Sequence, residues 1–228
     1  MTDLSPTPRS TAGRKADRAR TDRVELRALL DEALIGHLAV QVAGSPRVLP
    51  TGFGRIDDVL YVHGSTGARY LREAADREVC LAVTLLDGVV YARSVFHNSA
   101  NFRSAVVHAR ARTVDGDEKW RALRAISEHL APGSWDGARR PNPRELAATA
   151  VLALDLAESS VKVRDGAPVD DESDMDNDCW AGVLPLRRQW GEPQPCPLLP
   201  AETPVPDAVR NRAPRDQAGT GPRTGSHS

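Results

Sequence analysis

The sequence has few cysteines and no excess of charge of either sign. Three cysteines occur in 228 residues, at Cys80, Cys179 and Cys196, without Cys-x-x-Cys spacing. Such a small number of unpaired cysteines excludes a disulfide framework and a zinc site built from Cys-x-x-Cys pairs. The 30 basic and 31 acidic side chains nearly cancel. A dedicated nucleic-acid-binding protein would concentrate basic charge on one face, so we expect no nucleic-acid partner.

Long apolar runs are also missing. No segment approaches the roughly 20 apolar residues that a membrane-spanning helix needs. Polar residues follow Met1 where a signal peptide would have its apolar core. We therefore expect a cytoplasmic protein with no membrane partner.

Composition indicates one folded domain between two polar ends. Residues 1–20 and 199–228 are rich in small, polar and proline residues without periodicity, and we expect a disordered N-terminal arm and a disordered C-terminal tail there. Residues 21–198 carry the apolar patterns, with no internal linker or repeat. The chain is long enough to bury a well-developed core.

The domain is expected to open with a helix and to continue mostly as strands. Asp22 with Glu25 three residues later has the spacing of a capping box, and apolar residues then recur on one helical face up to a stop at Gly36. We expect further helices over 67–75 and 115–130, and one after Asn142. Strands are expected over 37–43, 47–56, 59–64, 79–86, 89–96, 104–111, 149–156, 160–164 and 181–190.

Several of these strands are joined by short turns. Asp87-Gly88 is typical of the turn of a tight hairpin. Short strands with few helices between them favour an antiparallel barrel or sandwich over a parallel α/β sheet. The pattern leaves the choice between barrel and sandwich open.

The stretch HGSTGARYL, from His63 to Leu71, is a candidate anion site. A strand ends, small residues follow and a helix begins, with Ser65 or Thr66 as its cap. Free backbone N–H groups at the helix start, a glycine at Gly64 and the guanidinium of Arg69 suit a phosphate. An ordinary capped helix with a surface arginine is the alternative.

Two other stretches suggest a ligand. RVLPTGFG, residues 47–54, has glycines within a strand, which mark either the close approach of a ligand or a bulge or barrel corner. FHNSANFRSAVVHARARTV, residues 96–114, places amides, hydroxyls and an arginine at the entry of a strand, where they could bond to the polar edge of a planar heterocycle. His97 is the candidate catalytic residue. The acidic run 170–178 lacks the glycine and terminal glutamate of an EF-hand, so we expect a solvated linker and no metal site.

In this order, RVLPTGFGR, LYVHGSTGAR, TLLDGVVYARSVFHNSANFRSAVVHARA, KVRDG and WAGVLPL resemble the pyridoxamine 5'-phosphate oxidase-like, FMN-binding split-barrel proteins. The flavin-nucleotide-binding branch related to nitroimidazole-resistance proteins is the most similar. The resemblance implies a mainly β fold, a six-stranded antiparallel split β-barrel with flanking helices, and a homodimer with FMN at the subunit interface. The FMN-binding positions that it implies are Arg47, Pro50, Thr51, Gly52, His63, Gly64, Ser65, Ala68, Arg69, Asn101, Arg103 and Ser104.

Two departures from the family pattern argue against authentic vitamin B6 oxidation. Tyr70 stands where the true oxidases have a second phosphate-binding lysine, and their C-terminal Arg-x-His substrate element is absent. The resemblance therefore implies a flavin-dependent oxidoreductase that acts on another small molecule, with a nicotinamide cofactor as candidate electron donor and His97 as candidate proton donor.

Two alternatives stay open at this point. One is a flavin-binding or flavin-storage module without turnover. The other is a split barrel that binds haem or the deazaflavin F420. For haem, the candidate ligands are His37, His63, His97 and His108.

Overall fold

The computed structural model describes Leu4 and residues 7–11, 16–200 and 202–212. The strands are β1 (Ala19–Arg20), β2 (Ile35–Val42), β3 (Ser45–Ile56), β4 (Val59–Ser65), β5 (Glu78–Tyr91), β6 (Ser99–Arg110), β7 (Arg112–Thr113), β8 (Thr149–Asp155), β9 (Glu158–Arg164) and β10 (Gly182–Pro185). The helices are α1 (Arg23–Glu32), α2 (Arg69–Ala74), α3 (Gly116–Leu130), α4 (Ser134–Gly137), α5 (Pro143–Ala147) and α6 (Asp207–Arg210). Short 3-10 turns, η1 (Ala16–Arg18), η2 (Val95–His97) and η3 (Glu172–Asp174), lie between them.

All the strands belong to one antiparallel sheet that turns a corner within β3. The strand order is β1-β9-β6-β5-β2-β3-β4-β8-β7, and β10 pairs with β5. Residues 45–52 of β3 pair with β2, whereas Phe53–Ile56 pair with β4. The two ends of this order do not pair with each other, so the barrel is split, as predicted. The sheet extends beyond the six strands expected, in part because short strands add at its edges.

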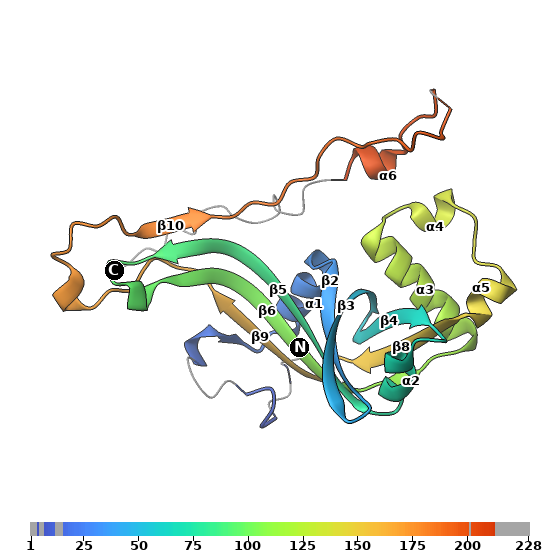
Figure 1. The fold of residues 1–228 in the computed structure, drawn as a ribbon, viewed down its shortest axis with the longest axis horizontal. Coiled ribbons are helices and arrows are strands. Elements are labelled where there is room, and N and C mark those ends of the chain that lie inside the picture. Colours follow the sequence, from blue (N-terminus) through green and yellow to red (C-terminus); the bar gives the residue numbers. More distant parts are fainter. Residues whose placement is uncertain (1–3, 5–6, 12–15, 201, 213–228) are drawn as a thin grey trace.

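Figure 1 shows how the layers are arranged. β5, β6 and β9 form a long curved arm on one side, and α3, α4 and α5 lie at the opposite end. The main core joins the leucines of α1 to the inner side chains of β2, β4, β5, β6 and β8. A second core packs α3 against the other face of β4 and β8. No helix among the described residues is long and apolar enough to cross a bilayer.

Two local predictions are wrong. The expected hairpin over 79–96 does not form: residues 79–91 belong to one continuous strand, β5, with a β-bulge at Asp87-Gly88, and η2 begins at Val95. The turn does not form because β6 pairs with β5 on both sides of the bulge, and β10 adds pairs beyond it. Gly36 does not stop α1, which ends at Glu32, because it lies in β2 and faces Leu81.

Both chain ends contact the domain where they are described. Leu4 is buried in the main core, Arg9 bonds to Glu78 and Glu158, and β1 pairs with β9. The C-terminal segment runs from β10 over the barrel to α6 (Figure 1). The expected disordered arm and tail are therefore partly structured, while residues 213–228 of the tail lie outside the described residues.

Candidate functional site

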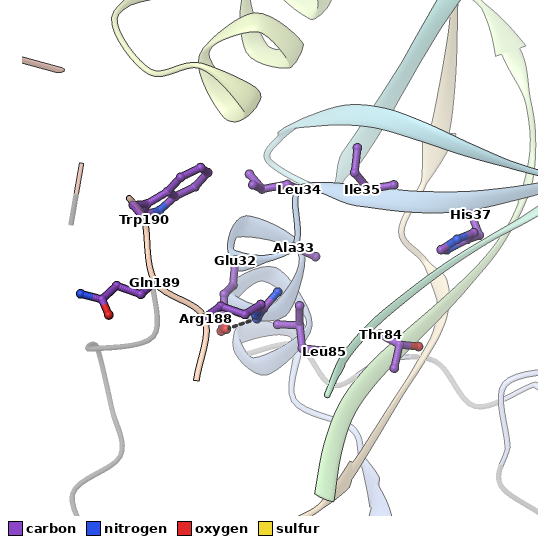
Figure 2. Close-up of a pocket in the computed structure, with 10 residues that line it drawn as sticks. All are labelled: Glu32, Ala33, Leu34, Ile35, His37, Thr84, Leu85, Arg188, Gln189 and Trp190. Carbon is purple, nitrogen blue, oxygen red and sulfur yellow. Dashed lines mark hydrogen bonds and ion pairs between the residues drawn. The ribbon is translucent and has the colours of Figure 1, made fainter. Parts of the chain in front are cut away.

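A pocket of about 390 Å³ opens where α1 ends and β2 begins. Its floor comes from α1, β2 and β5, and one wall comes from residues 186–190, which follow β10 and which we name the strap (Figure 2). The lining residues are Glu32, Ala33, Leu34, Ile35, His37, Thr84, Leu85, Arg188, Gln189 and Trp190. Apolar side chains share this lining with an imidazole, a guanidinium, a carboxylate, an amide and a hydroxyl, which suits a flat, mostly apolar ligand with polar groups at its edge.

His37 is the one sequence candidate that lines this pocket directly. It points outward from β2, between the exposed Pro50 on β3 and Ala82 on β5. Within the described residues its imidazole has no hydrogen-bond or ion-pair partner. The predicted β3 segment lies next to it, because Thr51 pairs with Gly36 and Gly52 pairs with Ile35. Three predicted cofactor-binding residues therefore flank the pocket without lining it.

Arg103 and Ser104 lie behind the pocket on β6, where they pair with Leu85 and Thr84. The Arg103 guanidinium donates to both carboxylate oxygens of Asp87, at 3.0 and 2.8 Å, and to Glu32 at the end of α1, where one bond is 2.8 Å. These bonds raise the pKa of Arg103, with Asp87 as the larger cause and Glu32 next. Arg103 thus holds the bulge and α1 together, and its direct contact with a cofactor stays a prediction.

Asn101 is buried, and its amide is already bonded within the chain. Its side-chain oxygen accepts from Arg164 and from the backbone N–H of Gly166, and its side-chain nitrogen donates to the Gly166 carbonyl. The amide therefore fixes the segment that leaves β9, and nothing in these contacts points toward the pocket. Arg47, at the far end of β3, is exposed.

The predicted phosphate segment lies at the corner of the sheet. His63 and Gly52 adjoin the Phe53–Val62 pair on neighbouring strands, so the two predicted segments meet there. A Cβ at Gly52 would meet nothing within 4 Å, which leaves room for a ligand beside the strand. Desolvation lowers the pKa of His63, although much of the residue stays exposed. A lowered pKa keeps the imidazole neutral near pH 7.

The helix cap in this segment differs from the prediction. The N-cap of α2 is Ala68, which makes no side-chain cap bond, and the Ser65 hydroxyl accepts from the N–H of Gly67 instead. The guanidinium of Arg69 is exposed and pairs with Glu73. The loop of small residues before α2 is therefore stabilised by a hydrogen bond within the loop, from the Gly67 N–H to the Ser65 hydroxyl.

His97, the predicted catalytic residue, lies in η2 between β5 and β6 and does not line the pocket. Its Nε2 is 3.3 Å from a carboxylate oxygen of Asp171. These two residues and Asp174 hold their ligand-type atoms within 4.8 Å of one another. The His97 imidazole thus contacts a carboxylate of the acidic run, and its catalytic role stays a prediction.

The acidic run is not simply a solvated linker. The Asp170 carboxylate is nearly buried and accepts from the backbone N–H and the guanidinium of Arg93. Asn177 donates to the carbonyl of the same arginine. The run therefore fastens the connection between β5 and β6.

Sequence reasoning missed most of the pocket's lining. Glu32 and Leu34 were expected to end an ordinary amphipathic helix. The strap was expected to continue the strand over 181–190, but β10 ends at Pro185. The available signal was Trp190, a large aromatic in a chain with only 4% aromatic residues. Large aromatics in irregular segments often mark contact surfaces.

Two solved structures are similar to this chain over most of its length. The chain is 37% identical to the flavocytochrome Anf3 from Azotobacter vinelandii, covering 91% of this chain and 98% of that one, with a TM-score of 0.86. It is 38% identical to the FAD- and haem-binding protein from Mycobacterium smegmatis, covering 86% and 98%, with a TM-score of 0.82.

A candidate 5-nitroimidazole antibiotic resistance protein from Bacteroides thetaiotaomicron shares the fold, at 19% identity over 64% of this chain and 86% of that chain, with a TM-score of 0.54. Among curated proteins no relative matched. The family model described as pyridoxamine 5'-phosphate oxidase matches residues 22–163. The family resemblance read from the sequence is confirmed, and the chain belongs to the pyridoxamine 5'-phosphate oxidase family.

Proposed function

We propose that this protein binds a flavin and a haem and carries electrons from a reduced donor to a small-molecule acceptor. The observation that carries the proposal is the imidazole of His37 in a pocket with otherwise mostly apolar walls. Haem proteins commonly hold the iron through a histidine and surround the ring with apolar side chains. When bound, the two cofactors supply the redox chemistry, and the chain supplies binding and orientation.

The residues of the pocket fit a porphyrin. Leu34, Ile35 and Leu85 give apolar contact, and His37 gives a nitrogen ligand without a competing partner among the described residues. Arg188 faces this space from the strap, and a guanidinium suits a carboxylate such as a propionate. Of the four candidate histidines, His37 alone lines this pocket, so we propose it as the haem ligand.

The flavin is proposed to bind at the corner of the sheet. Open space at Gly52 and the small-residue loop before α2 leave room for a ring and a phosphate, and Arg69 is near the surface there. FMN is the form implied by the sequence, and FAD is the form named for the mycobacterial relative. Both carry the same isoalloxazine ring and a phosphate, so the space at Gly52 and the loop before α2 suits either flavin.

The two relatives support the proposal because almost their whole length is matched. Coverage of 98% of each chain leaves hardly any part of either relative without a counterpart here. Vitamin B6 oxidation is not proposed, since the sequence lacks the substrate elements of the true oxidases. A nicotinamide cofactor is the proposed electron donor, and the cytoplasm is the proposed location.

We also propose a homodimer that packs through the outer face of the sheet. Val48, Ala39, Cys80 and His108 are register partners across four strands and so share this face. Val48 is 63% exposed there, and Leu86 on the same face is 41% exposed. Exposed apolar area on a sheet face favours association. Light scattering should give a dimer that Val48→Asp with Leu86→Asp splits, whereas Val24→Asp on α1 leaves it intact.

The visible absorption spectrum of the purified protein tests the cofactor proposal. We expect both a flavin and a haem contribution, and chromatography of the released chromophores identifies the flavin as FMN or FAD. His37→Ala should lose the haem and keep the flavin, whereas His108→Ala, on the same sheet face, should keep both. A colourless protein that takes up neither added flavin nor haemin would contradict the proposal.

The same preparation separates an enzyme from a storage module. NADH or NADPH added without oxygen should bleach the flavin of an oxidoreductase, and a nitroaromatic acceptor should restore it. A bound flavin that neither nicotinamide reduces would favour the storage alternative.

A further inference from the structure

The strap is anchored by backbone pairing at its start and by side-chain contacts beyond it. β10 pairs with residues 88–91 of β5, and the N–H of Leu186 donates to the Asp87 carbonyl at 2.9 Å. Beyond that point its side-chain contacts include one ion pair and one cation–π contact. Arg188 lies 3.4 Å from Glu32, and the Arg212 guanidinium lies 4.0 Å from the centre of the Trp190 ring. The strap is therefore a tethered segment with a fixed beginning.

The floor of the pocket is far more rigid than the strap. Ala33 and Leu85 on the floor are 1% and 3% exposed and belong to the main core. Trp190 on the strap is 41% exposed. Buried core residues resist displacement because moving them opens cavities, whereas an exposed ion pair holds a segment only weakly. The strap is thus the wall of the pocket that can adjust to a ligand.

The indole of Trp190 is the largest flat surface on the lining. Figure 2 shows it beside Leu34 at one end of the pocket, with His37 and Thr84 at the other. Arg212, which also donates to the Leu130 carbonyl at the end of α3, covers one face of the indole. Such a contact orients the ring, and we propose the opposite face for stacking.

We propose that Trp190 closes this pocket by stacking on a flat conjugated ring, while Arg188 and Gln189 bond to the polar edge of that ring. This inference rests on the proposed function, which places the haem in this pocket, so the ring in question is a porphyrin.

Titration of the apo-protein with haemin tests the proposal, and titration with FAD serves as a reference for the separate flavin site. Trp190→Ala should weaken haemin binding about tenfold, the usual effect of losing one aromatic stacking partner, and leave FAD binding unchanged. Trp190→Phe should recover part of the loss because it keeps an aromatic face. Trp180→Ala is the matched control, since Trp180 is exposed, packs on Tyr91 and does not line the pocket. It should change affinity by less than about twofold.

The outcomes separate the two proposals. If wild-type protein does not bind haemin, the proposed haem function fails, and the role of Trp190 fails with it. If it binds haemin and Trp190→Ala matches Trp180→Ala in affinity, the proposed function stands and the role of Trp190 is overturned. Circular dichroism and the urea midpoint should be the same for both alanine variants, so that the comparison reports on binding.

Discussion

Arg103 on β6 binds Asp87 on β5 through two parallel hydrogen bonds, at 3.0 Å from Nε and 2.8 Å from an Nη. Asp87 is the extra residue of the β-bulge, so these hydrogen bonds fix the bulge to β6. The same guanidinium binds Glu32 at the rim of the pocket. The end of α1, the bulge and β6 are therefore held as one unit beneath the proposed ligand.

Loss of this pair should destabilise the fold. Arg103→Ala removes the guanidinium that joins the half-buried carboxylates of Glu32 and Asp87, and Arg188, 3.4 Å from Glu32, reaches only the first of them. We expect a decrease of about 2 kcal/mol in the free energy of unfolding, reduced from the value for a fully buried pair because the site is partly exposed. Arg103→Lys should recover only part, because a lysine cannot form the fork. Urea unfolding followed by circular dichroism measures the difference.

The control for this experiment is Arg139→Ala, which breaks an exposed ion pair with Glu145. It should leave the urea midpoint nearly unchanged. Equal effects for Arg103→Ala and Arg139→Ala would mean that the network at the bulge contributes no more than a surface pair.

Two glycines on β3 should respond in opposite ways to a methyl group. A Cβ at Gly54 would lie 2.4 Å from the Ile126 backbone nitrogen on α3, whereas a Cβ at Gly52 would meet nothing within 4 Å. Gly54→Ala must push α3 away from the sheet, and we expect a loss of about 3 kcal/mol of stability. Gly52→Ala should fold normally.

The same pair tests the flavin site. Gly52→Val should keep the wild-type urea midpoint and lose bound flavin, because its side chain fills the space proposed for the ring. Retention of flavin at the wild-type ratio by folded Gly52→Val would exclude this position from the site.

The sequence predicted most elements because their signals are local. Asp22 caps α1, although its side chain accepts from the Val24 N–H and not in the capping box expected with Glu25, and Asn142 with Glu145 forms the capping box of α5. The hairpin at Asp87-Gly88 failed for a non-local reason. A turn dipeptide competes with ladder bonds from other strands, and here β6 and β10 supply those bonds on both sides of it. No local pattern reports which partners a strand will find.

The site was only partly predictable for the same reason. Residues 50–52 stand out in the sequence because glycine and proline within a strand are locally unusual. They flank the pocket, and their contact with a cofactor stays a prediction. The strap reaches the pocket through pairing between residues almost a hundred positions apart in the chain. Trp190 could be noticed in the sequence, but its position beside Leu34 depends on that long-range pairing.

Stability should depend on the protonation of His63. Desolvation lowers its pKa below the ordinary value of 6.5, so the unfolded chain binds a proton more readily than the folded chain. Stability therefore rises with pH from the lowered pKa up to about 6.5, and this contribution is lost as the pH falls through that range. His63→Gln should flatten the dependence. Urea midpoints at pH 5.5 and 7.5 for both proteins give the comparison, and an equal slope in His63→Gln would assign the dependence to other groups.

The attachment of the strap can be weakened without touching the pocket. A Cβ at Gly88 would lie 2.9 Å from the Leu184 carbonyl oxygen on β10, whereas one at Gly166 would meet nothing within 4 Å. Gly88→Ala should therefore displace β10 and release the strap that follows it, since two backbones cannot yield as a flexible side chain can. Trypsin should then cut after Arg187 and Arg188 several-fold faster than in Gly166→Ala, as measured by mass spectrometry of the fragments. Equal rates in the two variants would mean that side-chain contacts near the pocket, and not the pairing of β10 with β5, hold the strap in place.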